Sequence, residues 1–267
     1  MLLSITNIAW EPAEDGHMID FLCKQQFDGL EVAPTRVFHE NPYGNDKRPD
    51  AFLRSLRQLK VASVQAILYG RMENIFRSPL ERTAVSTHTK KAIGFAAALS
   101  AGNVVFGCPK NRDGYSPRHH DTAVSFFREL GEYALRHRTV LSIEPNPAIY
   151  GTNFINTTRQ AFDFALEINS PGFMVNVDLG TMLHNKEDLS LVEEQIDLVN
   201  HIHISEPNLD TIEKRAVHGD LAAMLRLKGY GKFVSIEARA YNDVGRLKET
   251  AAYIYDTFKG DGGNKKL

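Results

Sequence analysis

Residues 173–204, FMVNVDLGTMLHNKEDLSLVEEQIDLVNHIHI, contain the pattern that decides the fold. The segment opens with Phe173–Asp178, which has the apolar content of a short buried strand, and it closes with a second such run, Val199–Ile204. The amphipathic stretch Leu189–Leu198 between them is expected to be a helix. A strand, a helix and a second strand in this order predict a unit of parallel sheet with the helix packed outside it.

The same alternation extends from this segment to both ends of the chain. Most of the strand-like runs lack strict polar–apolar alternation, as expected of parallel strands that are buried on both faces. The predicted strands are Leu3–Ala9, Gly29–Ala33, Val61–Leu68, Asn103–Phe106, Val140–Glu144, Phe173–Asp178, Val199–Ile204 and Phe233–Glu237. The predicted helices are Ala13–Gln26, Asp50–Leu59, Pro79–Leu99, Pro117–Arg136, Thr157–Ile168, Leu189–Leu198, Gly219–Leu227 and Asp243–Phe258.

Eight strand–helix units in 267 residues predict an α/β fold, a single (β/α)8 TIM barrel, which takes roughly 250 residues. We expect one domain over residues 1–259 and a flexible C-terminal tail over residues 260–267, which are polar and Gly-rich. A doubly wound nucleotide-binding sheet is the weaker alternative. Residues 9–12, AWEP, follow the first strand where a GxGxxG loop would be needed, and the chain has no GxxxxGKS or GxxxxGKT loop.

The composition is that of an ordinary globular protein, with 43% hydrophobic residues, 24% charged residues and a net charge of −2. This balance gives no electrostatic reason to expect nucleic acid or an anionic membrane as a partner. The N-terminus does not resemble a signal peptide, and no run of about 18 apolar residues occurs, so we expect a cytoplasmic protein. The two cysteines, Cys23 and Cys108, suggest no disulfide framework.

Four polar residues stand at the ends of consecutive predicted strands, where the active site of such a barrel lies. Glu144 ends LSIE, Asp178 ends MVNVD, His203 lies in HIHI and Glu237 ends VSIE. They are 34, 25 and 34 residues apart, close to one strand–helix unit each, so we expect them to meet at one mouth. Singly, an acid after a strand is more often a helix N-cap and a histidine more often structural, but four in succession favour a shared site.

Three carboxylates at one mouth would repel one another and resist ionisation, and a divalent cation removes that difficulty. With one imidazole they form an oxygen-rich, fairly hard donor set. The sequence therefore predicts one divalent metal ion bound by Glu144, Asp178, His203 and Glu237. Manganese is the first expectation, with magnesium, cobalt or zinc as alternatives.

The stretches SIEPNP (142–147), NVDLG (176–180), HIHISEPN (201–208) and GYGKFVSIE (229–237) resemble the xylose-isomerase-like sugar phosphate isomerase/epimerase barrels. D-tagatose 3-epimerase-like barrels are the nearest named comparison, and weaker similarity upstream extends the resemblance over nearly the whole chain. The resemblance implies the same four metal ligands and makes Glu144 and Glu237 the catalytic acid and base. One takes a proton from the carbon next to the substrate carbonyl, the other returns one, and the metal stabilises the enediolate between these steps.

Two positions depart from the family pattern. Many relatives carry a histidine three residues after the metal-binding aspartate, where this chain has Thr181, and the nearby His184 could replace it or be an ordinary loop residue. The epimerase branch has a substrate-binding glutamate where this chain has Tyr150, whose phenol can donate a hydrogen bond to a sugar but is no carboxylate. We therefore expect a substrate other than the free ketose of the nearest comparison.

Further residues are candidates for lining the mouth. Trp10 could form an aromatic wall for a sugar, Glu31 could bond a hydroxyl, and Arg239 could hold an anionic group. With Tyr150 and His184, the full set of predicted substrate-binding residues is Trp10, Glu31, Tyr69, Asn146, Tyr150, His184 and Arg239. Lys110 and Arg112 are expected in a solvated loop, with phosphate or carboxylate binding as the alternative.

The function that the sequence favours is a metal-dependent isomerase or epimerase of a hydroxy-carbonyl sugar or sugar derivative. The alternatives are a metal-dependent dehydratase of a keto-polyol, of the inosose or dehydroshikimate dehydratase kind, and a non-catalytic sugar-binding barrel. A repair endonuclease is disfavoured by Thr181 and by the acidic balance. The expected partner is a small-molecule sugar, and a homo-oligomer is left open.

Overall fold

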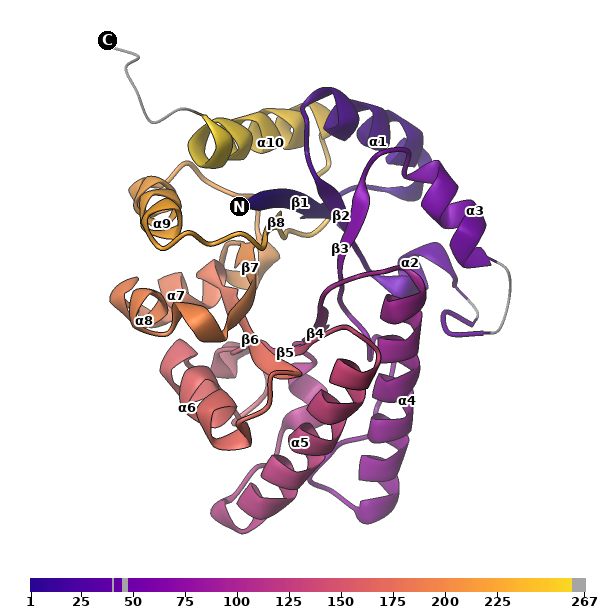
Figure 1. The fold of residues 1–267 in the computed structure, drawn as a ribbon, viewed down its shortest axis with the longest axis vertical. Helices are drawn as coiled ribbons and strands as arrows, with labels where there is room; N and C mark the ends of the chain where they lie inside the picture. The colour runs from indigo at the N-terminus through magenta and orange to yellow at the C-terminus, as the bar shows by residue number, and fades with distance from the viewer. Residues whose placement is uncertain (40, 45–47, 261–267) are drawn as a thin grey trace.

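Eight parallel strands close into a barrel in chain order, with β8 returning to pair with β1. The computed structural model describes residues 1–39, 41–44 and 48–260. Helices form an outer ring around the strands (Figure 1). The strands are β1 (Leu2–Thr6), β2 (Gly29–Val32), β3 (Lys60–Val64), β4 (Val104–Phe106), β5 (Leu141–Ile143), β6 (Phe173–Asp178), β7 (Val199–Ile204) and β8 (Phe233–Ile236). The predicted (β/α)8 fold is confirmed, and of the predicted tail only Gly260 lies within the described residues.

Four of the helices, α4, α6, α7 and α10, begin at a residue whose side chain caps the first turn. The Ser78 hydroxyl accepts from the Glu81 amide at 3.2 Å before α4, and Thr157 and Gln160 form a capping box before α6. The α-helices are α1 (Asp15–Lys24), α2 (Pro34–Val37), α3 (Arg48–Ser55), α4 (Pro79–Ala98), α5 (His120–Arg136), α6 (Thr158–Ile168), α7 (Leu179–Asn185), α8 (Ser190–Glu194), α9 (Ala216–Leu227) and α10 (Val244–Lys259). Short 3-10 helices are η1 (Pro12–Glu14), η2 (Pro109–Arg112), η3 (Pro117–His119), η4 (Ala148–Tyr150), η5 (Ile196–Leu198) and η6 (Pro207–Leu209). Within the described ranges, no helix has both the length and the apolar character to cross a bilayer.

The connection between β6 and β7 differs from the prediction. A helix was expected over Leu189–Leu198, but the first helix of this connection is α7, which starts directly after β6. Asp178 causes this early start, because its carboxylate caps α7 by accepting from the backbone of Thr181 at 2.7 Å. The predicted stretch itself forms only α8 and the short η5.

Two predicted strands are too long at their C-terminal ends. The run Leu3–Ala9 is a strand only to Thr6, and Val61–Leu68 is a strand only to Val64. Ala66 has a left-handed backbone with φ of 53°, which a strand cannot contain. Beyond these strands Ala9, Ile67 and Leu68 are buried in the loops, so the composition there resembles that of a strand.

The two faces of the strands carry different side chains. Outward residues are apolar and pack against the helices, as where Phe127 of α5 contacts Phe106 of β4 and Phe173 of β6 with ring centroids 5.0 and 5.4 Å away. Alternate residues point into the barrel, and in the later strands these are polar and buried: Ser142, Asn176, His201 and Ser235. The apolar core therefore lies between strands and helices, and the interior of the barrel holds a polar network.

Candidate metal centre

Four side chains from consecutive strands meet at the C-terminal mouth of the barrel. Glu144 and Glu237 directly follow β5 and β8, Asp178 ends β6, and His203 is the fifth residue of β7. The strand register sets Asp178 beside His203, and Ser235, two residues before Glu237, on the other side of His203. Each side chain offers one ligand atom, and these atoms all lie within 4.8 Å of one another. The structure thus brings together all four residues predicted to hold a metal ion.

The imidazole of His203 lies between the two glutamates. Its Nδ1 is 2.8 Å from Glu144 Oε1 and 3.0 Å from Glu237 Oε2. The His203 side chain is fully buried, whereas the side chains of Glu144 and Glu237 are 11% and 9% exposed. The glutamates are therefore accessible from the mouth, while the histidine lies beneath them.

Asp178 serves the helix and the cluster at once. Its Oδ2 accepts from the backbone amide and the hydroxyl of Thr181, both at 2.7 Å, and its Oδ1 accepts from the Ser205 hydroxyl. Thr181 and Ser205 are themselves buried. Asp178 is therefore the N-cap of α7, as an acid after a strand often is. The same hydrogen bonds fix the position of its carboxylate in the cluster.

Burial and crowding disfavour the ionised forms of two of these acids. Burial, followed by repulsion from Glu144, raises the pKa of Asp178, and burial raises the pKa of Glu237 to about 7 despite attraction to His203. Burial alone would lower the pKa of His203, but attraction to Glu237 and Glu31 outweighs it and holds this pKa well above its usual value. Among the described residues, only His203 offers a basic group within ion-pair distance of Glu144 and Glu237.

This donor set fits a divalent cation. Oxygen-rich sites hold such ions at about 2.0–2.6 Å, so ligand atoms on opposite sides of the ion can be about 4–5 Å apart, as the spacing within this cluster requires. The other ring nitrogen of His203, Nε2, is 3.0 Å from a carboxylate oxygen of Glu31. When Nε2 carries the proton, the lone pair of Nδ1 points to the cluster. A cation would also supply the positive charge that the three acids lack.

Arg112 corrects an expectation from the sequence, because it does not lie in a solvated loop. Its guanidinium is fully buried and donates to the carbonyl oxygens of Gly107, Phe154 and Glu144 at 2.8, 2.9 and 2.6 Å. It also donates at 2.6 Å to the side chain of Asn146, which in turn donates at 3.2 Å to Glu144 Oε2. Burial lowers the pKa of Arg112 to about 10, so it stays charged at neutral pH. Arg112 orders the loop that carries Glu144.

Two more residues that the sequence analysis did not select also fix Glu144. Asn176 donates to Glu144 Oε1 at 2.7 Å, and a Cβ on Gly107 would lie 2.6 Å from Glu144 Oε2. Asn176 lies two residues before Asp178, so both side chains share the inner face of β6. The period of two was a signal for Asn176, whereas no sequence signal marks the close approach at Gly107.

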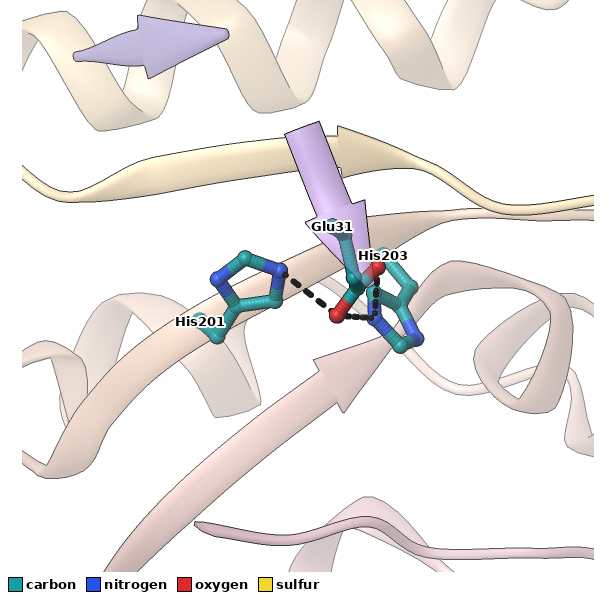
Figure 2. Close-up of side chains that lie close together, drawn as sticks. All are labelled: Glu31, His201 and His203. Atoms are coloured by element: carbon teal, nitrogen blue, oxygen red, sulfur yellow. Dashed lines mark hydrogen bonds and ion pairs between the residues drawn. The ribbon is translucent and has the colours of Figure 1, made fainter. Parts of the chain in front are cut away.

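Glu31 is fully buried, and its carboxylate lies close to the rings of His201 and His203 (Figure 2). Its Oε2 is 3.0 Å from His203 Nε2 and accepts from the Ser235 hydroxyl at 3.0 Å, and His201 is 3.4 Å from its Oε1. Burial by itself would raise the pKa of Glu31, but attraction to His203 and His201 holds it well below the usual value. The carboxylate is thus engaged with protein side chains, and its contact with a substrate hydroxyl stays a prediction.

Two aromatic residues predicted to bind substrate have their polar groups partly engaged. Trp10 is 2% exposed, and its indole N–H donates to Asp15 at 2.8 Å. The Tyr150 oxygen accepts from the backbone N–H of Asn208 at 2.6 Å, which leaves its own proton to donate. Burial, with repulsion from the three acids of the cluster, raises the pKa of Tyr150, so it stays a neutral donor near the centre.

The remaining predicted substrate contacts lie at the surface. Tyr69 is 75% exposed, and His184 is exposed on α7. The side chain of Arg239 is 61% exposed and pairs with Asp210 at 3.0 Å. Asn146, by contrast, is 7% exposed and contacts Glu144. Their roles toward a substrate stay predictions.

Comparison with known proteins places this barrel in a family. A similar solved structure is the 3-keto-D-glucoside 4-epimerase of E. coli, at 18% identity and TM-score 0.76, over 95% of this chain and 98% of that one. Another is the D-psicose 3-epimerase of Clostridium cellulolyticum H10, at 15% identity and TM-score 0.81, over 97% and 98%. A third is the probable 3-DHS dehydratase of Bacillus anthracis, at 15% identity and TM-score 0.73, over 98% and 100%.

At these identities the structural likeness establishes the fold alone. No curated protein matches the chain in sequence. The model of the xylose isomerase-like TIM barrel family matches residues 20–257. Because that match spans most of the sequence, the chain belongs to the xylose isomerase-like TIM barrel family.

Proposed function

We propose that this chain is a metal-dependent isomerase or epimerase that acts on a hydroxy-carbonyl sugar or sugar derivative. The observation that carries the proposal is the placement of Glu144 and Glu237 around one point, 2.8 and 3.0 Å from His203 Nδ1. Two accessible carboxylates from strands on opposite sides of β6 and β7 suit a reaction that removes a proton from carbon and returns one. The similar sugar epimerases support this choice of chemistry.

Glu144, Asp178, His203 and Glu237 would hold the cation, which we propose to be manganese. Magnesium, cobalt and zinc are the alternatives that three carboxylates and one imidazole permit. When bound, the ion supplies electrophilic polarisation of the substrate carbonyl and orients a neighbouring hydroxyl.

The two glutamates would exchange protons with the substrate. One takes the proton from the carbon next to the carbonyl, and the electrons of the broken C–H bond form the carbon–carbon double bond of an enediolate. The other gives a proton to the opposite face of the same carbon, which epimerises it, or to the neighbouring carbon, which isomerises the sugar. Asn176 and Asn146 hold both oxygens of Glu144 at 2.7 and 3.2 Å, so its orientation is set before the substrate binds.

The Tyr150 hydroxyl is a proposed substrate donor close enough to the three acids for their charges to raise its pKa. Its proton is available because its oxygen already accepts from the backbone of Asn208. Asn146 would support the reacting end of the sugar, and Trp10, Tyr69, His184 and Arg239 remain candidates for contacts further out. A donor at Tyr150 favours a substrate with an acceptor oxygen at that position.

Elemental analysis and solvent deuterium exchange test the proposal together. Purified protein should contain about one equivalent of divalent metal. In D2O it should place deuterium on carbon in one member of a panel of D-psicose, D-tagatose, D-fructose, L-ribulose and a 3-keto-D-glucoside, the sugars of the similar enzymes. Glu144→Gln and Glu237→Gln should each slow exchange by about 10²–10⁴, and Glu132→Gln, on the exposed face of α5, should not.

The outcome distinguishes the competing functions. Metal without exchange into any bound sugar would favour a sugar-binding barrel. A product that absorbs as an enone, formed without epimer, would favour a dehydratase. No metal after reconstitution with Mn²⁺ would overturn the proposal.

A further inference from the structure

A second cluster of ionisable side chains lies inside the barrel beneath the mouth. Glu31 of β2 faces His201 and His203 of β7, and all three are at most 1% exposed (Figure 2). β2 and β7 are not neighbours in the barrel, so the contact crosses its interior. His203 belongs to both clusters, with Nδ1 toward the mouth and Nε2 toward Glu31.

We propose that Glu31 is a positioning residue that orients His203 for metal binding. Its carboxylate lies 3.0 Å from Nε2 of His203, where it would keep the proton of the neutral imidazole on Nε2 and leave the Nδ1 lone pair free for a metal ion. A carboxylate behind a ligating histidine also makes the imidazole a stronger donor. This inference rests on the metal-binding part of the proposed function and explains why a charged residue lies in the closed interior.

Glu31 is held by a hydrogen bond from Ser235, whereas the nearby His201 Nε2 makes no hydrogen bond to a described residue. The Ser235 hydroxyl donates to its Oε2 at 3.0 Å, and His201 Nε2 lies 3.4 Å from its Oε1. The pairing of β2 with β3 shifts register between Leu30 and Glu31, an irregularity of the kind that turns a side chain to a new direction. Ser235 lies in β8, two residues before the proposed metal ligand Glu237. The same short segment therefore provides one proposed ligand and the hydroxyl that holds Glu31 behind another ligand, His203.

A second metal ion on these three residues is the competing interpretation. The contacts of Glu31 with His203 and with Ser235 are both 3.0 Å, as expected of hydrogen bonds. A cation between Glu31 and His203 would have to replace the Nε2 proton. It would also have to enter a site that is closed to solvent, since Glu31, His201 and His203 are all at most 1% exposed. The closure of this cluster to solvent therefore favours positioning, and metal stoichiometry separates the two interpretations.

The test is calorimetric titration of the metal-free protein with Mn²⁺. Glu31→Gln keeps the size of the side chain and one acceptor oxygen but removes its charge, and it should weaken binding about 10–100-fold at an unchanged stoichiometry of one. Ser235→Ala removes one support of Glu31 and should weaken binding to a smaller extent. Ser142→Ala is the matched control, because its hydroxyl is equally buried but bonds Asn103 and not Glu31. Its affinity should equal that of the wild type.

Unfolding midpoints of the metal-free variants separate positioning from general loss of structure. Equal affinity in wild type and Glu31→Gln would overturn the inference, and so would two metal ions in the wild type with one in the variant. If Glu31→Gln does not fold, Ser235→Ala decides, and an affinity equal to that of Ser142→Ala overturns the inference. A wild type that binds no metal would overturn the proposed function itself. Metal binding of equal strength in the wild type and in Glu31→Gln would overturn only the role of Glu31.

Discussion

The two ends of the barrel interior are both lined by buried polar side chains, but they differ in charge. At the end opposite the mouth, the Asn103 amide donates to the Ser63 hydroxyl at 3.0 Å and accepts from Ser142 and Asn200 at 2.5 and 2.8 Å. This far-end network is neutral, and its donors match its acceptors. At the mouth, three carboxylates gather around the one imidazole of the cluster.

The difference supports the mouth as the place of the proposed chemistry. A matched neutral network stabilises the fold, whereas crowded carboxylates in a buried site resist ionisation and need a cation. Cavity size does not identify the mouth as the proposed site, because a cavity of about 630 Å³ opens at the far end beside Asn103 and His201. In this barrel the unbalanced charge, more than the empty volume, marks the functional end.

The largest effect on stability is expected from the arginine that supports the mouth. Arg112→Met keeps much of the buried apolar stem but leaves the carbonyls of Gly107, Phe154 and Glu144 without their donor. Since each unsatisfied buried acceptor costs about 1–3 kcal/mol, unfolding by urea should show a loss of about 3 kcal/mol or more. Lys110→Met, at an exposed neighbouring position, should change stability by less than about 0.5 kcal/mol. A loss below about 1 kcal/mol for Arg112→Met would mean that other donors replace it.

A single methyl group at the mouth should be the next largest disturbance. Gly107→Ala places a Cβ 2.6 Å from Glu144 Oε2, so the carboxylate must move. A shift of about 1 Å in a catalytic group can slow a reaction about 10²-fold, and the exchange rate and the Mn²⁺ affinity should both fall. Gly102→Ala is the matched control at the far end, where the added Cβ meets no atom within 4 Å. Equal activity of the two variants would show that Glu144 is not held where the reaction occurs.

The far-end network should affect stability without affecting the metal. Asn103→Ala leaves Ser63, Ser142 and Asn200 without their shared partner, which should cost about 2 kcal/mol in urea unfolding. The Mn²⁺ affinity of the folded variant should match that of the wild type. A fall in affinity would break the comparison, because it would couple the two ends of the interior.

Residue pattern alone predicts the barrel and the members of the cluster, because both depend on local signals repeated along the chain. Each of Glu144, Asp178, His203 and Glu237 stands at or near the end of an apolar run, and the ends of parallel strands converge whatever the loops do. The stretch Leu189–Leu198 forms α8 and η5 in place of one continuous helix, and the prediction missed α7, which the capping contact of Asp178 starts directly after β6.

The supporting roles of Arg112 and Glu31 could not be predicted, because each depends on contacts between residues that are distant in the sequence. Arg112 follows a strand and is charged, so its composition indicates a solvated loop, yet it is buried against two carbonyls of the connection between β5 and α6. Glu31 meets His203 only when the barrel closes across its interior. Alternation of polar residues could have indicated Asn176 and Ser235, since each stands two residues before a predicted ligand.

The smallest expected effect concerns the charge of the mouth when no metal is bound. The pKa of Glu237 is raised from 4.5 to about 7, so its contribution to stability is present below about pH 4.5 and is lost as pH rises through about 7. Chelator-treated wild type should therefore lose stability relative to Glu237→Gln between pH 5 and 8, by about 1 kcal/mol for each pKa unit that is realised. Thermal unfolding of both proteins across this range, with Glu132→Gln as the control, measures the difference. If Glu237→Gln is the less stable protein at pH 8, the Glu237 carboxylate stabilises the metal-free fold, and the mouth then carries no unbalanced charge to distinguish it from the far end.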